Sequence, residues 1–416
     1  MGLENKSEGR LIESLLRERF QVRFCSFSAL DNYLNLAPLP YIFLETNADI
    51  ARLAHLAEEL HFPGADLADG AADSGGKRFY FRCRDNLDSY NTPNYGTPPA
   101  YSYKILSLVQ NAGNCHFQDM LGIYPVIRYI KDTAKDAARN NGQNPETGTA
   151  CWWESICPGT NHFQALTDAA LILARYQALD YPSRDFIEAL SLCIENKTPP
   201  GKEAQQVLLI GLMVSSRPDR GLELLKACGF LQKFWPEIAR LDNVDHSKEF
   251  HPEGNAWKHT LMTFEHRKQN TNGEYDLRLS LALLLHDIGK PLSEVSGNKR
   301  FDGHAELGAR EACRFLERLD FDSALVDDVF YLVKNHMLPA ALARLSFMKT
   351  GEVMKSPLFP SLMELYRCDE SSSFKGLEGY YENSAAYQNY LRNMKNPFRG
   401  ADGKKFANHK RKSYHK

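Results

Sequence analysis

The first part of the chain mixes short apolar runs with turn residues, which is the pattern of an α/β domain. Residues 40–44, Pro-Tyr-Ile-Phe-Leu, predict a strand, and the polar residues 47–49 are suited to cap a helix over Ile50–Leu60. A second strand is predicted at Lys77–Arg82, where aromatic side chains suit a half-buried pleated surface. The three prolines and the glycine of residues 91–100 indicate a loop.

Beyond residue 160 the apolar positions recur with a helical period. Stripes of apolar residues run over residues 205–214 and 222–227, and Gly229 is placed to end the second of these helices in a left-handed conformation. Residues 132–160 are polar and rich in turn residues, so they predict a linker. The clearest stripe has the spacing i, i+3, i+4, i+7 and i+8 and consists of Leu166, Ala169, Ala170, Leu173 and Ala174.

The helical pattern continues from Trp257 to Cys368, so the expected fold class is mixed. A small α/β head would be followed by an all-α body and an all-α C-terminal domain. The expected divisions are a head at 1–135, a linker at 136–162, a helical body at 163–245, a C-terminal domain at 246–372, and a helical extension with a basic flexible tail at 373–416.

The bulk composition excludes several classes of protein. Hydrophobic residues make up 43% and charged residues 25%, which is ordinary for a globular chain, and the net charge of −2 gives no general attraction to DNA. The apolar run Leu279–Leu285 is among the longest and is far too short to cross a bilayer. The nine cysteines are scattered and contain no C-x-x-C pair. We therefore expect a cytoplasmic protein with no membrane contact and no DNA partner.

Histidines are concentrated in the C-terminal half. Seven of the 13 lie between His246 and His336. The adjacent pair His286-Asp287 follows an apolar helix and precedes Gly289. A single buried histidine is usually a satisfied core residue, but this pair has further histidines on both sides and a late aspartate. The pattern therefore favours a metal site over packing alone.

Imidazole and carboxylate ligands together suit a divalent ion of the Mn, Ni, Co, Fe or Mg kind. The predicted ligands are His259, His286, Asp287 and Asp369. His304 and His336 are candidates for holding a second ion or gripping a phosphate. An ion in this site would polarise a phosphoryl oxygen and make hydroxide available near neutral pH. Catalytic roles are then expected for Asp287, which would orient the attacking water, and for Lys290, which would neutralise phosphate charge. The alternative for Lys290 is a solvated cation at a helix end.

Four segments resemble the HD domain of bacterial tRNA nucleotidyltransferases (CCA-adding enzymes) and the poly(A) polymerase family. They are His251–Thr260, Phe301–Ala309, Val333–Met337 and Leu365–Asp369, and the resemblance covers about residues 246–370. Arg220–Leu231 is more weakly similar to the helical body of that family. The resemblance implies an α/β head, a helical body, a divalent metal, and a nucleotide or RNA phosphoester as substrate.

The head departs from the family at its catalytic motif. Nucleotidyl transfer needs two carboxylates about one residue apart on a strand, because both hold the catalytic Mg²⁺ pair. Before residue 150 no two acidic residues are separated by a single residue, and the strand at this place offers only Glu45. Gly75-Gly76 is followed by Lys77-Arg78 instead of a carboxylate pair. We therefore expect a degenerate nucleotidyltransferase-like head at residues 1–135.

These observations predict a metal-dependent phosphohydrolase of the HD type, a phosphatase or a 2′,3′-cyclic phosphodiesterase, acting on nucleotides or RNA ends. Two alternatives stay open: a non-catalytic RNA- or nucleotide-binding protein, and an active tRNA nucleotidyltransferase with a rearranged head. Residues 395–416 hold eight Lys or Arg against one Asp, so this tail is a candidate RNA contact.

Overall fold

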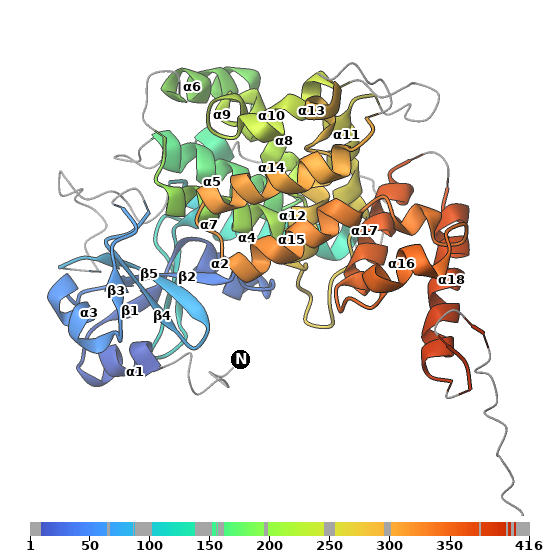
Figure 1. The fold of residues 1–416 in the computed structure, drawn as a ribbon. Coiled ribbons are helices and arrows are strands. Elements are labelled where there is room, and N and C mark those ends of the chain that lie inside the picture. The colour runs from blue at the N-terminus through green and yellow to red at the C-terminus, as the bar shows by residue number, and fades with distance from the viewer. Residues whose placement is uncertain are drawn as a thin grey trace, which may run out of the picture. The chain divides into compact units, whose positions relative to one another are not determined.

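The computed structural model divides into two compact units, and each is described by itself. The first unit comprises Met1–Ala239, Lys268–Leu277 and Arg318–Asp320, and the second comprises Arg240–Arg267, Arg278–Glu317 and Phe321–Lys416. Figure 1 shows the elements of both. The residues that the structure describes are 10–64, 67–85, 87, 102–137, 152–154, 156, 162–194, 199–244, 254–294, 301–373, 376–396, 398–400 and 403–404.

A seven-stranded sheet forms the head of the first unit, in the order β3-β4-β5-β2-β1-β6-β7. The central strands β2 and β5 run parallel, with Leu44 opposite Phe81, and every other neighbouring pair is antiparallel. The strands are β1 (Val22–Phe24), β2 (Tyr41–Thr46), β3 (Leu60–His61), β4 (Gly70–Ser74), β5 (Lys77–Cys83), β6 (Leu108–Asn111) and β7 (Phe117–Asp119).

Helices accompany the sheet and then continue as a helical body. Asp49 caps α3 because its Oδ1 accepts a hydrogen bond of 2.7 Å from the Arg52 amide. The helices of this unit are α1 (Arg10–Arg17), α2 (Ser26–Leu34), α3 (Ile50–Leu56), α4 (Tyr124–Ala137), α5 (His162–Arg175), α6 (Arg184–Ile194), α7 (Lys202–Met213), α8 (Pro218–Ala227), α9 (Phe230–Phe234) and α10 (Pro236–Ala239), with the 3₁₀ turns η1 (Lys104–Leu106) and η2 (Trp152–Glu154).

The core of the head lies between the sheet and helices α1 and α3. Leu15, Leu44, Leu53 and Phe81 are almost completely buried in this cluster. The helical body is joined to the head by polar contacts as well. Arg175 Nη2 on α5 lies 2.8 Å from Asp31 Oδ2 on α2, and both side chains are buried. Sheet and helical body of the first unit therefore share one packed interior.

The second unit is helical throughout its described residues. Helix α17 packs against α11, α15 and α18. The elements are η3 (Arg240–Asn243), α11 (Ala256–Thr263), η4 (Phe264–His266), α12 (Leu277–Leu285, whose first residue belongs to the first unit), α13 (Lys290–Glu294), α14 (His304–Arg318, whose last residue does), α15 (Ser323–Asn335), η5 (Pro339–Ala341), α16 (Phe347–Met354), α17 (Phe359–Ser371) and α18 (Glu378–Met394).

The fold class predicted from the sequence is confirmed, with an α/β sheet followed by helices. Strands β2 and β5 and the buried stripe of α5 stand where the pattern placed them. One helix boundary was wrong: α3 ends at Leu56, and Leu60 pairs instead with Ala72 in the β3–β4 ladder.

Three predicted segments lie wholly or mostly outside the described residues: the loop at 91–100, the linker at 136–162 and the basic tail beyond residue 404. Within the described part of the chain, none of the helices has the length and the apolar character needed to cross a membrane.

Candidate metal centre and head pocket

The His286-Asp287 pair lies in the turn that follows α12. The helix ends at Leu285, and the four residues after it form a turn before α13 begins at Lys290. Gly289 lets this turn approach α14 very closely. A Cβ at this position would lie 2.1 Å from the His304 carbonyl oxygen and 2.5 Å from the Gly308 amide nitrogen. The glycine thus brings the pair next to His304.

Three predicted ligands from three segments form the first group of the centre. His259 lies on α11, capped by Asn255, His286 follows α12, and Asp369 lies near the end of α17. His259 Nε2 is 2.8 Å from Asp369 Oδ1, and His286 Nε2 is 3.9 Å from the same oxygen. One donor atom from each residue lies within 4.8 Å of the other two, a spacing compatible with a shared ion.

Asp287 and two further histidines form the second group. His304 is the first residue of α14, and His336 caps the end of α15. Asp287 Oδ1 lies 3.6 Å from His304 Nε2 and 4.0 Å from His336 Nε2, while the two Nε2 atoms are 3.1 Å apart. All three side chains are buried. Four imidazoles and two carboxylates therefore meet in one protein interior.

The hydrogen bonds of the histidine rings show which nitrogen of each ring carries a proton and which one is left to face the centre. Nδ1 of His286, His304 and His336 lies 2.7–2.8 Å from a backbone carbonyl oxygen, which can only accept, so each Nδ1 carries the proton. In a neutral ring, Nε2 then presents a lone pair. Nε2 of His286 makes no hydrogen bond to any residue that the structure describes. Lone pairs converging in this way are suited to bind a cation.

Burial and neighbouring charges favour neutral rings for two of the histidines and charged forms for the two carboxylates. Burial lowers the pKa of His336 to about 4 and also lowers the pKa of His304, so both rings are neutral near pH 7. Burial alone would raise the pKa of Asp287, but the adjacent His286 and Lys290 outweigh it and hold that pKa well below its usual range. Burial likewise raises the pKa of Asp369, but the neighbouring His259 outweighs it and holds that pKa below its usual range.

The structure brings all six predicted ligand residues together but divides them differently from the sequence prediction. Asp287 lies with His304 and His336, although its Oδ2 is also 3.3 Å from His286 Nε2. Lys290 Nζ lies 2.6 Å from that same Oδ2, and the residue Lys290 is only 9% exposed. The ammonium group of Lys290 is therefore a buried counter-ion of Asp287.

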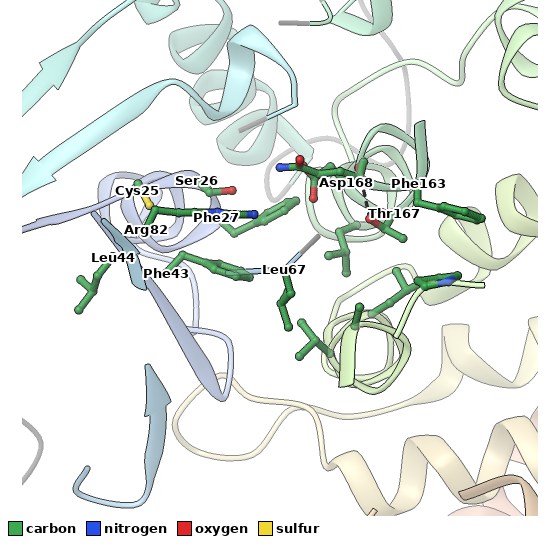
Figure 2. A pocket seen from close by; sticks show the side chains of 16 residues that line it. Cys25, Ser26, Phe27, Phe43, Leu44, Leu67, Arg82, Phe163, Thr167 and Asp168 are labelled. Carbon is green, nitrogen blue, oxygen red and sulfur yellow. Dashed lines mark hydrogen bonds between the residues drawn. The ribbon is translucent and has the colours of Figure 1, made fainter. Parts of the chain in front are cut away.

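A pocket in the first unit was not predicted from the sequence. Figure 2 shows Phe43 and Arg82 of the sheet on one side of it, and Phe163 and Asp168 of α5 on the other. The Ser102 hydroxyl donates a hydrogen bond of 2.5 Å to Asp168 Oδ2. Burial nevertheless raises the Asp168 pKa to about 7. No sequence motif marks Ser102 or Asp168, because they meet only through the packing of α5 on the head.

Strand β2 carries aromatic residues where paired carboxylates would serve metal binding. Tyr41 and Phe43 lie two residues apart on this strand and stack edge to face, with ring centroids 5.5 Å apart. The Tyr41 hydroxyl donates to the Val207 carbonyl oxygen at 3.0 Å. Glu45 is completely buried, and Arg84 Nε lies 2.8 Å from its Oε1. The residues of β2 therefore do not fit a pair of magnesium ions.

Comparison with known proteins supports the domain resemblance. The model of the HD domain matches residues 257–369. The chain is 36% identical over 186 residues to the CC-adding tRNA nucleotidyltransferase of Thermus thermophilus, which covers 43% of this chain and 41% of that protein. It is also 36% identical over 132 residues to the Multifunctional CCA protein of Halorhodospira halophila, covering 32% of this chain and 31% of the relative. The matches thus span less than half of each relative.

The fold is similar to a solved structure over nearly the whole chain. The CCA-adding enzyme of Bacillus stearothermophilus, solved in complex with CTP, aligns with 94% of this chain and 84% of its own, at a TM-score of 0.51 and 11% identity. At this identity the likeness concerns the fold alone.

These comparisons overturn the main functional prediction. One relative is named a CC-adding tRNA nucleotidyltransferase and the other a Multifunctional CCA protein, and neither name mentions a phosphohydrolase. The prediction of an HD phosphohydrolase as the function of the chain was therefore wrong, and the alternative of a nucleotidyltransferase is better supported. The error has a physical source: a buried cluster of histidines and aspartates reports that a cation can bind, and not which reaction the whole chain performs.

Proposed function

Since this chain belongs to the tRNA nucleotidyltransferase family and carries a C-terminal HD domain, we propose that it is an enzyme that transfers nucleotides from CTP or ATP to a tRNA-type acceptor. The single observation that carries this proposal is the sequence identity of 36% to a CC-adding tRNA nucleotidyltransferase. Because less than half of that relative is matched, the activity needs a direct test.

The pocket of the first unit is the proposed nucleotide site. Phe27, Phe43 and Phe163 offer apolar faces to a planar base, and Arg82 and Asp168 offer polar groups at its wall. Arg82 lies 3.4 Å from Asp69 and is almost completely buried, so its guanidinium is held in a fixed position. An aromatic pocket with a few fixed polar groups is suited to bind a nucleobase.

The aromatic residues of β2 favour a second candidate function, which is binding of RNA or nucleotide without transfer. Tyr41 and Phe43 stand on the strand that would carry the metal-binding carboxylates, and Glu45 is already paired with Arg84. Transfer would then require carboxylates from elsewhere in the chain, whereas binding in the pocket would not.

One incorporation assay separates the two candidates. The full chain is incubated with Mg²⁺, labelled CTP or ATP, and tRNA that lacks its terminal CCA. Incorporation supports transfer, and we expect Asp168→Asn to reduce it at least tenfold. Glu188→Gln is the matched control, because Glu188 lies exposed on α6 and pairs only weakly with Arg184 there. Tight tRNA binding with no incorporation would refute transfer and support the binding function.

We also propose that the second unit holds a divalent ion of the Mn, Ni, Co, Fe or Mg kind. His259, His286, Asp287 and Asp369 are the proposed ligands, with Asp287 balanced by Lys290. His304 and His336 are proposed to hold a second ion or a phosphate. Support comes from the buried Nε2 atoms of His304 and His336, which lie 3.1 Å apart while each Nδ1 donates to a backbone carbonyl oxygen.

Metal analysis of the purified chain tests this site. After loading with Mn²⁺ or Ni²⁺ and desalting, the wild-type chain is expected to retain at least one equivalent, and His286→Ala to retain less than a tenth of that. His266→Ala is the control, because His266 lies in the same unit but in neither ligand group. Equal metal content in wild type and His286→Ala would remove the proposal.

The domain divisions at 1–135, 136–162, 163–245, 246–372 and 373–416 remain our proposal. Limited proteolysis with mass spectrometry of the products would test them, because cleavage is expected to concentrate in exposed connecting segments.

A further inference from the structure

The four histidines of the centre are not all held in the same way. In three of them the Nδ1 atom donates to the carbonyl oxygen three residues earlier in the chain: His286 to Leu283, His304 to Phe301 and His336 to Val333. His259 lies on α11, and its Nδ1 instead faces a side chain, the hydroxyl of Ser372, at 3.2 Å. A side chain, unlike a carbonyl group, can be removed by substitution.

The Ser372 hydroxyl has its own proton committed elsewhere. Ser372 caps the end of α17 and is 2% exposed. Its Oγ donates to the Asp369 carbonyl oxygen at 2.7 Å. A serine hydroxyl has one proton, so towards His259 the oxygen acts as an acceptor. The proton of the His259 ring is therefore held at Nδ1.

The same hydroxyl fixes the opposite side of the ring. With Nδ1 protonated, Nε2 of a neutral His259 carries the lone pair, and it lies 2.8 Å from Asp369 Oδ1. Two acceptors at this separation are attracted to each other only through a shared proton or cation. Ser372 thus forms hydrogen bonds with the backbone of Asp369 and with the ring of His259, which are two of the predicted ligands.

We infer that Ser372 is a positioning residue of the divalent-cation centre, which orients His259 so that its Nε2 lone pair and the Asp369 carboxylate meet at one ion. The inference rests on the metal site proposed above. Residues that bond to the outer nitrogen of a ligand histidine set its tautomer and its orientation, and their loss typically weakens metal binding about 10- to 100-fold.

Calorimetric titration of Mn²⁺ or Ni²⁺ into the full chain tests the inference. Ser372→Ala is expected to bind the ion about 10- to 100-fold more weakly than wild type. Ser372→Thr keeps the hydroxyl and is expected to bind within about threefold of wild type. Ser373→Ala is the matched control, because the Ser373 hydroxyl makes the same kind of bond, to the Glu370 carbonyl oxygen at 2.8 Å.

A second measurement separates positioning from folding. In the metal-free chain, ¹⁵N chemical shifts of the His259 ring are expected to show a proton at Nδ1 in wild type and Ser372→Thr, whether or not Nε2 shares a second proton with Asp369, and a smaller share of protonated Nδ1 in Ser372→Ala. A Ser372→Ala chain that binds the ion as wild type does, or whose Nδ1 stays protonated as in wild type, overturns the inference. A wild-type chain that binds no divalent ion overturns the proposed metal site, and the role of Ser372 with it.

Discussion

At the scale of single residues, Asp168 shows how a carboxyl group can be kept protonated near neutral pH. It is partly buried in the wall of the head pocket, where burial raises its pKa to about 7. The Ser102 hydroxyl donates to it, which opposes this rise but does not cancel it. A carboxyl group balanced at this point changes its charge within the ordinary range of assay pH.

The first unit is therefore expected to lose stability as pH rises from about 4 to about 7. The native state keeps the proton on Asp168 over this range while the unfolded state releases it, so the contribution is fully present below the unfolded pKa of about 4 and is lost through the folded pKa of about 7. Partial exposure reduces the effect to roughly 2 kcal/mol. Urea unfolding of wild type and Asp168→Asn at pH 4.5 and pH 8 measures it, and the variant should lose less.

The control for this comparison is Asp185→Asn, because Asp185 lies on the exposed first turn of α6. Should the pH dependence of Asp168→Asn match that of wild type and of this control, Asp168 would not be the group that titrates.

At the scale of secondary-structure elements, the approach of the turn after α12 to α14 determines whether the centre can form. Gly289 and Gly308 face each other across this approach, and the Gly289 amide nitrogen would lie 3.0 Å from a Cβ built at Gly308. The close contact puts Asp287 beside His304, which is the first residue of α14. A side chain at Gly289 would push these two segments apart.

Gly289→Ala is expected to destabilise the second unit by roughly 3 kcal/mol, in the range of overpacked sites. Its methyl group would meet the backbone of His304 and Gly308, which cannot move aside as a flexible side chain can. Gly379→Ala on α18 is the matched control, because its Cβ would meet only the ends of the Tyr366 and Glu370 side chains. Urea unfolding measures both, and an equal effect would show that the approach is not tightly packed.

The difference between local and distant contacts explains which elements could be predicted from the sequence. The stripe of α5 and strands β2 and β5 were predictable because they depend on periodicity within a short segment. The pairing of Leu60 with Ala72 was missed, since strand β3 has only two residues and no periodic pattern. The predicted helix that begins at Ile50 was therefore extended to Leu60, because the sequence does not identify β4 as the partner of this short strand.

The candidate centre was likewise predictable only in part. Its residue types were recognisable from the sequence, but the grouping of Asp287 with His304 and His336 depends on which way the turn after α12 faces. The role of Ser372 was not predictable either, because it lies 113 residues from the ring that it contacts. Neither this grouping nor the contact of Ser372 can be inferred from the spacing of residues along the sequence.

At the scale of the whole molecule, the two candidate sites fall in different compact units. The pocket with Asp168 belongs to the first unit, and every ligand of the candidate metal centre belongs to the second. A ligand that binds only the folded form of one unit stabilises that unit by mass action and leaves the other without a direct gain. The two sites should therefore be separable by the response of each unit to its own ligand.

Scanning calorimetry of the full chain with and without Mn²⁺ tests this separation. Two transitions are expected, and Mn²⁺ at about 100 times its dissociation constant should stabilise only one of them, by about 2.7 kcal/mol. His286→Ala should abolish that shift and leave the other transition in place, because His286 is a buried residue of the second unit. CTP without Mn²⁺ is the complementary probe and should act on the transition that the metal leaves unchanged. If Mn²⁺ raised both transitions equally in wild type and still did so in His286→Ala, the ion would be binding outside this centre.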